Sequence, residues 1–184
     1  MDYIYGHASD ISQEIRASFF HYRYKVFVER LGWELNTPID HETDQFDHEG
    51  TVYVIARDEF GDVAGCARLL PTSSPYLLEE VFPQLLNGQP APKSSVIWEL
   101  SRFTTCDLKD DSLANSRNQF SAELTIELLR ATLACARSLG AERVISVSPL
   151  GVERLLRKAG FNAHRAGPPM IIDGYPLFAC WIEL

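Results

Sequence analysis

The longest helical pattern of the chain lies between two runs of strand-forming residues, and this arrangement limits the folds that it can adopt. Apolar residues recur at every third or fourth position through residues 117–139, and Gly140 ends the pattern. Residues 96–103 before it and 142–148 after it are rich in β-branched and aromatic residues. A strand, a helix and a strand in succession predict helices that pack on a sheet.

The remaining segments extend this alternation, and 184 residues suit one domain over residues 1–184. Asp10 or Ser12 can cap the first helix. We predict an α/β (α+β) three-layer sandwich with a central, mostly antiparallel sheet flanked by helices. The other predicted elements are a helix over 10–30, a polar loop over 32–50, a hairpin of 51–58 and 63–70, short helices over 76–86 and 150–159, and one or two strands around the turn at 173–174.

Composition excludes several classes of protein. With 25 acidic and 17 basic residues the formal net charge is −8, which gives no support to nucleic-acid binding. The four cysteines are scattered, unlike those of a metal site or a small disulfide framework. The chain has neither a cationic start followed by an apolar run nor an apolar stretch of roughly 18 residues. We therefore expect a soluble, unprocessed cytoplasmic protein that does not bind membranes.

The acidic loop over residues 40–49, DHETDQFDHE, invites a metal-binding interpretation. A calcium loop needs glycine at its sixth position and an acidic residue at its twelfth, but Gln45 and Thr51 stand there. We therefore predict no metal, and expect Asp44 and Asp47 to face a cation of another kind. Two aromatic residues indicate that the loop is partly buried: Trp33 and Phe46.

Residues 98–103, WELSRF, combine a buried-strand pattern with charged side chains. A regular strand places Glu99 and Arg102 on opposite faces, so both can serve one cleft only if a bulge or another break interrupts the pleat. A buried ionised group costs several kcal/mol unless it is paired. The run is therefore either a strand end where Glu99 and Arg102 neutralise each other or part of a reaction site.

These and other blocks resemble the acyl-homoserine lactone synthases, the LuxI-type autoinducer synthases, in order, in spacing and over essentially the whole chain. The resemblance implies a fold similar to the GNAT acyltransferases and no cofactor. The matching blocks are Arg23, Phe27, LGW at 31–33, the E-x-D-x-x-D spacing of Glu42, Asp44 and Asp47, ARLLPT at 67–72, VFP at 81–83, WELSRF at 98–103 and ERLLRKAGF at 153–161.

The reaction that the resemblance implies joins an acyl thioester to S-adenosylmethionine. The methionyl amine takes the acyl group, and the carboxylate then closes on its own γ-carbon, which releases 5′-methylthioadenosine and an N-acyl-homoserine lactone. Acylation requires a neutral amine, for which Glu99 is the candidate base. The resemblance implies six catalytic residues: Arg23, Asp44, Asp47, Arg68, Glu99 and Arg102.

The substrate sites follow from the same resemblance. A sulfonium favours acidic and aromatic surroundings, and arginines can grip the substrate carboxylate or order the aspartates by forked hydrogen bonds. The implied S-adenosylmethionine site is Arg23, Phe27, Trp33, Asp44, Asp47, Phe82 and Arg102. The implied acyl-chain residues are Leu100, Ser101 and Ser146, where serine in place of threonine favours an unsubstituted chain of medium length.

The acyl donor implied by the resemblance is acyl carrier protein. Coenzyme A enzymes of the GNAT type hold the pyrophosphate on a glycine-rich loop, whereas residues 104–120 contain no glycine. Acyl carrier proteins are acidic and need a basic docking patch. The expected patch is Arg143, Arg154, Arg157 and Lys158, although an ordinary solvated helix face is the alternative.

Three other functions are compatible with parts of the sequence. A GNAT N-acyltransferase that uses acyl-coenzyme A on another amine fits the fold but not the glycine-free segment. A sensor without catalytic activity would use the same polar residues to bind a ligand. A structural or interaction module leaves the clustering of charged and aromatic residues in the matching blocks unexplained.

Overall fold

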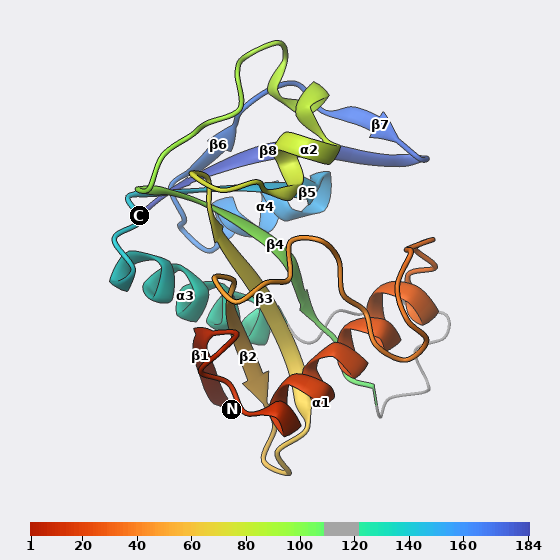
Figure 1. Ribbon diagram of the computed structural model, residues 1–184. Coiled ribbons are helices and arrows are strands. Elements are labelled where there is room, and N and C mark those ends of the chain that lie inside the picture. Colours follow the sequence, from red (N-terminus) through yellow and green to blue (C-terminus); the bar gives the residue numbers. More distant parts are fainter. Residues whose placement is uncertain (109–121) are drawn as a thin grey trace. The chain divides into compact units, whose positions relative to one another are not determined.

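The computed structural model describes residues 1–108 and 122–184, which form two compact units (Figure 1). The first unit comprises Met1–Arg68 and Arg102–Thr132, and the second comprises Leu69–Ser101 and Leu133–Leu184. The prediction of a single domain stays a prediction. Among the described residues no helix is long and apolar enough to cross a membrane.

The first unit is built on four strands in the order β1-β2-β3-β4, with β1 and β2 antiparallel. Strands β3 and β4 continue into the second unit, and so does helix α3. The elements are β1 (Asp2–His7), α1 (Gln13–Arg23), the π-helix η1 (Tyr24–Arg30), β2 (Val52–Arg57), β3 (Val63–Pro71), β4 (Ile97–Thr105) and α3 (Ala122–Ser138).

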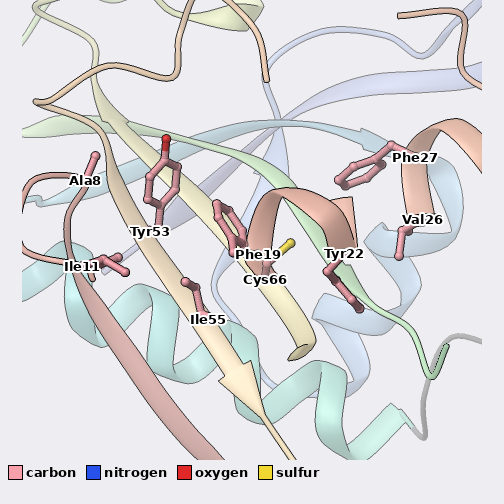
Figure 2. Close-up of a cluster of buried hydrophobic side chains, with 9 residues drawn as sticks. All are labelled: Ala8, Ile11, Phe19, Tyr22, Val26, Phe27, Tyr53, Ile55 and Cys66. Atoms are coloured by element: carbon pink, nitrogen blue, oxygen red, sulfur yellow. The ribbon is translucent and has the colours of Figure 1, made fainter. Parts of the chain in front are cut away.

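Helices lie on both faces of the sheet in the first unit, so this unit has the three layers that the sequence predicts. Cys66 belongs to the core cluster that α1 and η1 form with β2 (Figure 2). A Cβ on the preceding residue, Gly65, would lie 3.1 Å from Leu128 of α3. Because successive strand residues face opposite sides, α1 and α3 cover opposite faces.

Helix α1 begins where the sequence predicts a cap, because the Ser12 side chain accepts a hydrogen bond from the Ile15 N–H. Its buried face carries Phe19 and Tyr22, and both are at most 1% exposed. The predicted helix over 10–30 is therefore right in extent, but its last two turns wind as a π-helix, a form frequent at functional sites.

The second unit has the strand order β3-β4-β5-β8-β6, with β7 also paired to β8. Strands β4 and β5 pair in parallel, whereas β8 pairs antiparallel with each of β5, β6 and β7. Its remaining elements are α2 (Leu77–Val81), the 3₁₀ helix η2 (Pro83–Leu86), β5 (Arg143–Pro149), α4 (Leu150–Lys158), β6 (Ala163–Arg165), β7 (Met170–Ile172) and β8 (Tyr175–Glu183).

The predicted elements are confirmed, and two strands are additional. Residues 32–50 contain neither helix nor strand, and the hairpin, the short helices and the strands around residues 173–174 lie where they are predicted. Strands β1 and β6 are not predicted, because β1 contains a glycine and β6 has only three residues. The predicted start of the long helix, residues 117–121, lies outside the described residues.

Candidate functional site

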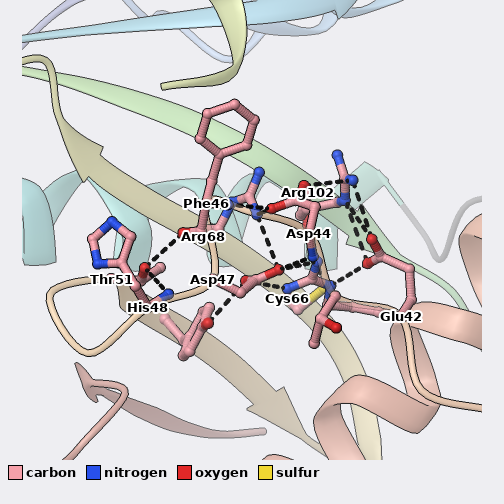
Figure 3. Close-up of polar contacts among 12 residues, drawn as sticks. Glu42, Asp44, Phe46, Asp47, His48, Thr51, Cys66, Arg68 and Arg102 are labelled. Atoms are coloured by element: carbon pink, nitrogen blue, oxygen red, sulfur yellow. Dashed lines mark hydrogen bonds and ion pairs between the residues drawn. The ribbon is translucent and has the colours of Figure 1, made fainter. Parts of the chain in front are cut away.

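Three arginines and three carboxylates gather in the first unit (Figure 3). Arg23 is the last residue of α1, Arg68 lies on β3 and Arg102 on β4. The carboxylates all come from the loop between η1 and β2. We call these six residues the ionic cluster: Arg23, Glu42, Asp44, Asp47, Arg68 and Arg102.

Arg23 forms the buried side of the ionic cluster and is fully shielded from solvent. Its Nη1 and Nη2 donate to the two oxygens of Asp47 at 2.8 and 2.9 Å, a forked pair. Its Nε donates to Oε2 of Glu42, which is also fully buried. Arg23 therefore fixes two carboxylates of the loop against the end of α1.

The other two arginines meet at Asp44. Arg68 Nη1 donates to Asp44 Oδ1 at 2.5 Å and lies 3.2 Å from Asp47 Oδ2. Arg102 Nη2 donates to Asp44 Oδ2 at 2.8 Å and to Glu42 Oε1 at 3.1 Å. Asp44 and Asp47 therefore both face guanidinium groups, and the pair between Arg23 and Asp47 is forked. The expected roles of these residues toward a substrate stay predictions.

The loop that carries the carboxylates is shaped by its own side chains. Asp44 accepts a hydrogen bond from the Phe46 N–H at 2.9 Å, as aspartates do in tight turns. Asp47 Oδ2 accepts one from the Asp44 N–H at 2.9 Å. The Glu42 N–H donates to the Phe20 carbonyl of α1 at 3.1 Å, which attaches the loop to the helix.

The cluster holds its buried groups in their charged forms. Burial opposes ionisation of Glu42, but Arg23 and Arg102 outweigh it and lower the pKa of this carboxyl. Burial also disfavours the Asp47 carboxylate, whose pKa Arg23 and Arg68 nevertheless hold well below its ordinary value. Burial works against the Arg23 charge as well, and Asp47 and Glu42 raise its pKa. Each charge therefore depends on its partners.

Arg102 adopts a backbone conformation that breaks the pleat of β4. Its φ is +50°, in the left-handed region that side-chain-bearing residues rarely occupy. The sequence requires such a break if Glu99 and Arg102 are to serve one cleft, and the structure has one at Arg102, which pairs with Glu42 and Asp44 of the first unit. Local strain of this kind is typical of functional sites.

Aromatic rings line the partly exposed side of the cluster. Phe27 and Trp33 stack with ring centroids 4.8 Å apart, and the Arg102 guanidinium lies 5.6 and 5.8 Å from the two centroids. Trp33 is 36% exposed, and the Asp44 side chain is 16% exposed. Trp33 and the Asp44 carboxylate are therefore accessible from solvent, whereas Phe27 is buried beneath Trp33.

A solvent-open pocket of about 320 Å³ borders the other side of the cluster. Asp44 and Asp47 contribute to its lining together with the rings of Phe20 and Tyr53. The Arg23 guanidinium lies 5.4 Å from the Phe20 ring centroid. Carboxylates beside aromatic rings favour a cationic ligand.

Two side chains of the site fall outside the residues predicted to act. Glu42 belongs to the E-x-D-x-x-D spacing, but only the structure places it between Arg23 and Arg102. Tyr53 donates its hydroxyl to Asp47 Oδ1 at 2.8 Å, and burial followed by the Asp47 charge raises its pKa. The sequence does not indicate that Tyr53 belongs to the site, because a tyrosine is an ordinary residue of a strand such as β2.

We expect Tyr53→Phe to destabilise the protein by about 1–2 kcal/mol, because it removes a buried hydrogen bond to a charged carboxylate. Tyr5→Phe is the matched control, since Tyr5 lies on the neighbouring strand and is 63% exposed. Urea unfolding of the two variants measures the difference. Equal stability of both variants would contradict a contribution from the Tyr53 hydroxyl.

The other predicted site residues lie in the second unit, and they make contacts within that unit. Glu99 is fully buried and accepts hydrogen bonds from the backbone N–H groups of Leu77 and Leu78. Leu100 and Ser146 are register partners on β4 and β5, so their side chains share a face. Ser101 follows on the opposite face of the strand, so these predicted acyl-chain residues do not all line one surface.

The predicted basic patch divides into two groups. Arg154, Arg157 and Lys158 are exposed on α4. Arg143 instead lies on β5, donates to Glu183 at 3.0 Å and stacks 4.0 Å from the Trp181 ring centroid. The α4 residues are therefore the accessible part of the predicted docking surface.

Comparison with known proteins gives matches over the whole chain. The family model described as Autoinducer synthase matches residues 8–182. The acyl-homoserine-lactone synthase of Acinetobacter nosocomialis is 54% identical over 184 residues, 100% of this chain and 100% of that protein. TofI, solved in a ternary complex with an inhibitor and MTA, is 43% identical, with a TM-score of 0.85 over 100% of this chain and 91% of the TofI chain.

More distant solved structures share the fold. BjaI, a coenzyme A-dependent acyl-homoserine lactone synthase solved with S-adenosylmethionine and isopentyl-CoA, is 27% identical, with a TM-score of 0.83 over 98% of this chain and 81% of that chain. A proposed N-acetyltransferase from Lactobacillus plantarum is 17% identical, with a TM-score of 0.64 over 100% and 98%. The similarity to the N-acetyltransferase concerns the fold alone, and it confirms the GNAT-like architecture.

Proposed function

The chain belongs to the autoinducer synthase family and is an acyl-homoserine-lactone synthase, and from this premise we propose that it transfers its acyl group from acyl carrier protein to S-adenosylmethionine. The product is an N-acyl-homoserine lactone quorum-sensing signal, and 5′-methylthioadenosine leaves. The single observation that carries the choice of S-adenosylmethionine is the ionic cluster with its aromatic edge. We place the reaction in the cytoplasm.

In this proposal the buried members of the ionic cluster order the site, and its accessible members contact the substrate. Arg23 and Arg68 are fully buried and hold the two aspartates, so they order the site. Asp44 and the Phe27–Trp33 stack face the sulfonium, which acidic and aromatic groups stabilise. Arg102 can grip the carboxylate of S-adenosylmethionine. Phe82, which lies in the second unit, is proposed as a contact only because the family resemblance implies it.

Positioning accounts for most of the proposed catalysis. Acylation requires the amine at the thioester carbon, with loss of one proton and release of the donor thiol. Lactone closure then requires the carboxylate behind the γ-carbon, because the sulfonium is already a good leaving group. A rigid cluster that holds both ends of the amino acid supplies this geometry, for which effective molarities are large.

The proposed acyl chain lies along the shared face of β4 and β5. Leu100 contributes apolar surface there, and Ser146 is 5% exposed with its hydroxyl 3.0 Å from that of Ser148. Ser101 lies on the opposite face of β4, so the role in acyl-chain binding that the resemblance implies for it is separate from this surface. We propose an unsubstituted chain of medium length, which the resemblance implies for a serine at position 146.

The acyl donor is proposed on the basis of charge. The protein is acidic overall, with a formal net charge of −8, yet α4 presents three exposed basic residues: Arg154, Arg157 and Lys158. Such a patch suits an acidic carrier protein. BjaI, however, is described as coenzyme A-dependent, so the donor needs a direct test: initial rates with the same acyl chain on carrier protein and on coenzyme A.

Charge reversal on α4 tests the docking surface. We expect Arg154→Glu with Arg157→Glu to raise the Michaelis constant for acyl carrier protein by about tenfold or more, because both changes put like charges against an acidic partner. The Michaelis constant for S-adenosylmethionine should stay within about twofold. Arg137→Glu, an exposed change on α3, is the control. An unchanged Michaelis constant for acyl carrier protein in the double variant would contradict the docking proposal.

A further inference from the structure

The buried carboxylate of Glu99 is bonded to the start of a helix. Oε1 accepts a hydrogen bond from the Leu78 N–H at 2.6 Å, and Oε2 accepts one from the Leu77 N–H at 3.1 Å. Leu77 and Leu78 are the first two residues of α2, and Glu99 is fully shielded from solvent. Each oxygen of the carboxylate thus holds one backbone donor.

Helix α2 has no cap of its own. The first N–H groups of a helix lack partners within it, and burying such a donor without a partner is costly. Tyr76 occupies the N-cap position but makes no side-chain hydrogen bond there. Glu99 therefore supplies from strand β4 the acceptors that a serine or aspartate cap supplies in other helices.

The helix that Glu99 caps carries Phe82 at its end. The Phe82 N–H donates to the Leu78 carbonyl at 3.2 Å, and the Phe82 carbonyl accepts from the Leu85 N–H of η2 at 3.0 Å. The position of the Phe82 ring thus depends on where α2 begins. Phe82 is a residue that the family resemblance assigns to S-adenosylmethionine.

We propose that Glu99 is a positioning residue, which fixes α2 and through it Phe82, and that it does not act as the proton acceptor. A proton taken by this carboxylate would weaken the bonds that hold α2. The reaction has less need of a dedicated base, because the positive sulfonium of S-adenosylmethionine disfavours the protonated form of its own amino group and lowers the pKa of that group. The consequence for S-adenosylmethionine rests on the proposed function, whereas the anchoring of α2 does not.

A pair of variants separates the two roles. In Glu99→Gln the amide oxygen can still accept from Leu78, but the amide NH₂ faces the Leu77 N–H, which leaves two donors opposed. Leu77→Pro removes that N–H, and proline suits the first position of a helix after an extended residue such as Tyr76. The double variant therefore restores the anchor without restoring a carboxylate.

We expect Glu99→Gln to speed amide exchange at Glu80 and Phe82 by about tenfold and to raise the Michaelis constant for S-adenosylmethionine by a similar factor, with kcat within about threefold. The double variant should recover most of both effects, and the pH profile of kcat should keep its acidic limb in each. Leu77→Pro alone should change both quantities less than Glu99→Gln does, because the Glu99 carboxylate keeps its bond to the Leu78 N–H and no donors are opposed.

The opposite pattern would overturn the proposal: unchanged amide exchange in Glu99→Gln, a fall in kcat of about 10² to 10⁴ that Leu77→Pro does not relieve, and loss of the acidic limb. Amide exchange requires no substrate. Failure of the unaltered enzyme to release methylthioadenosine would therefore count against the proposed function while leaving the anchor testable.

Discussion

Replacing Glu42 by glutamine is expected to lower the free energy of unfolding by about 3–5 kcal/mol, the usual result of removing one partner from a buried charge network. Glu42 is fully buried and accepts from both Arg23 and Arg102. A neutral amide leaves excess positive charge in the cluster and presents an NH₂ group to guanidinium donors. The rate of lactone formation should fall as well, because Arg102 loses its ion pair with the Glu42 carboxylate.

Glu49→Gln is the matched control for Glu42→Gln. Glu49 lies on the same loop and undergoes the same chemical change, but it is exposed. Its substitution should alter the free energy of unfolding by no more than about 0.5 kcal/mol. Urea unfolding at pH 7 with all three proteins measures the difference. Equal midpoints for the two variants would mean that the buried network does not stabilise the fold.

Substitution of Arg102 is expected to separate activity from stability. Arg102→Lys keeps the charge but loses the planar fork that joins Glu42 to Asp44, and the stack with Trp33. We expect kcat/KM for S-adenosylmethionine to fall by about 100-fold, the size of effect that misplacement by an ångström produces. Arg102→Ala should be at least as impaired.

The backbone at Arg102 gives an internal control. At a φ of +50° a glycine avoids the steric cost that alanine bears, and part of this gain is offset by the greater freedom of glycine in the unfolded chain. Arg102→Gly should therefore be about 0.5–1 kcal/mol more stable than Arg102→Ala although both lack activity. Higher stability of the alanine variant would contradict the assigned conformation.

Much of the fold could be predicted because local signals agree with it. Ser12 caps α1, Gly160 has the left-handed φ of +78° expected after α4, and the apolar spacing of residues 10–30 matches the buried face of α1. The strands that escaped prediction depend on pairing across the sheet. Strand β1, for example, is held by its register with β2, and a glycine weakens its local preference.

Most members of the ionic cluster were among the predicted site residues, but Glu42 and the bond from Tyr53 were missed, and the pairing within the cluster could not be predicted. The spacing of Glu42, Asp44 and Asp47 marks an acidic loop, but it does not say which arginine each carboxylate meets. That pairing depends on contacts across more than 20 residues, such as Arg102 with Asp44. Face alternation in WELSRF shows that Glu99 and Arg102 can share a cleft only across a break in the pleat. The bonds from Leu77 and Leu78 to Glu99 could not be predicted, because they join segments that only the fold brings together.

The central claim is tested most directly by mass spectrometry of the products that the purified enzyme makes from S-adenosylmethionine and an acyl-loaded carrier protein. We predict 5′-methylthioadenosine and an N-acyl-homoserine lactone in equal amounts, with both lost in Arg102→Ala and kept in Glu49→Gln. Release of the carrier thiol without methylthioadenosine would contradict the account, because it would mean that the acyl group leaves its carrier without forming the lactone.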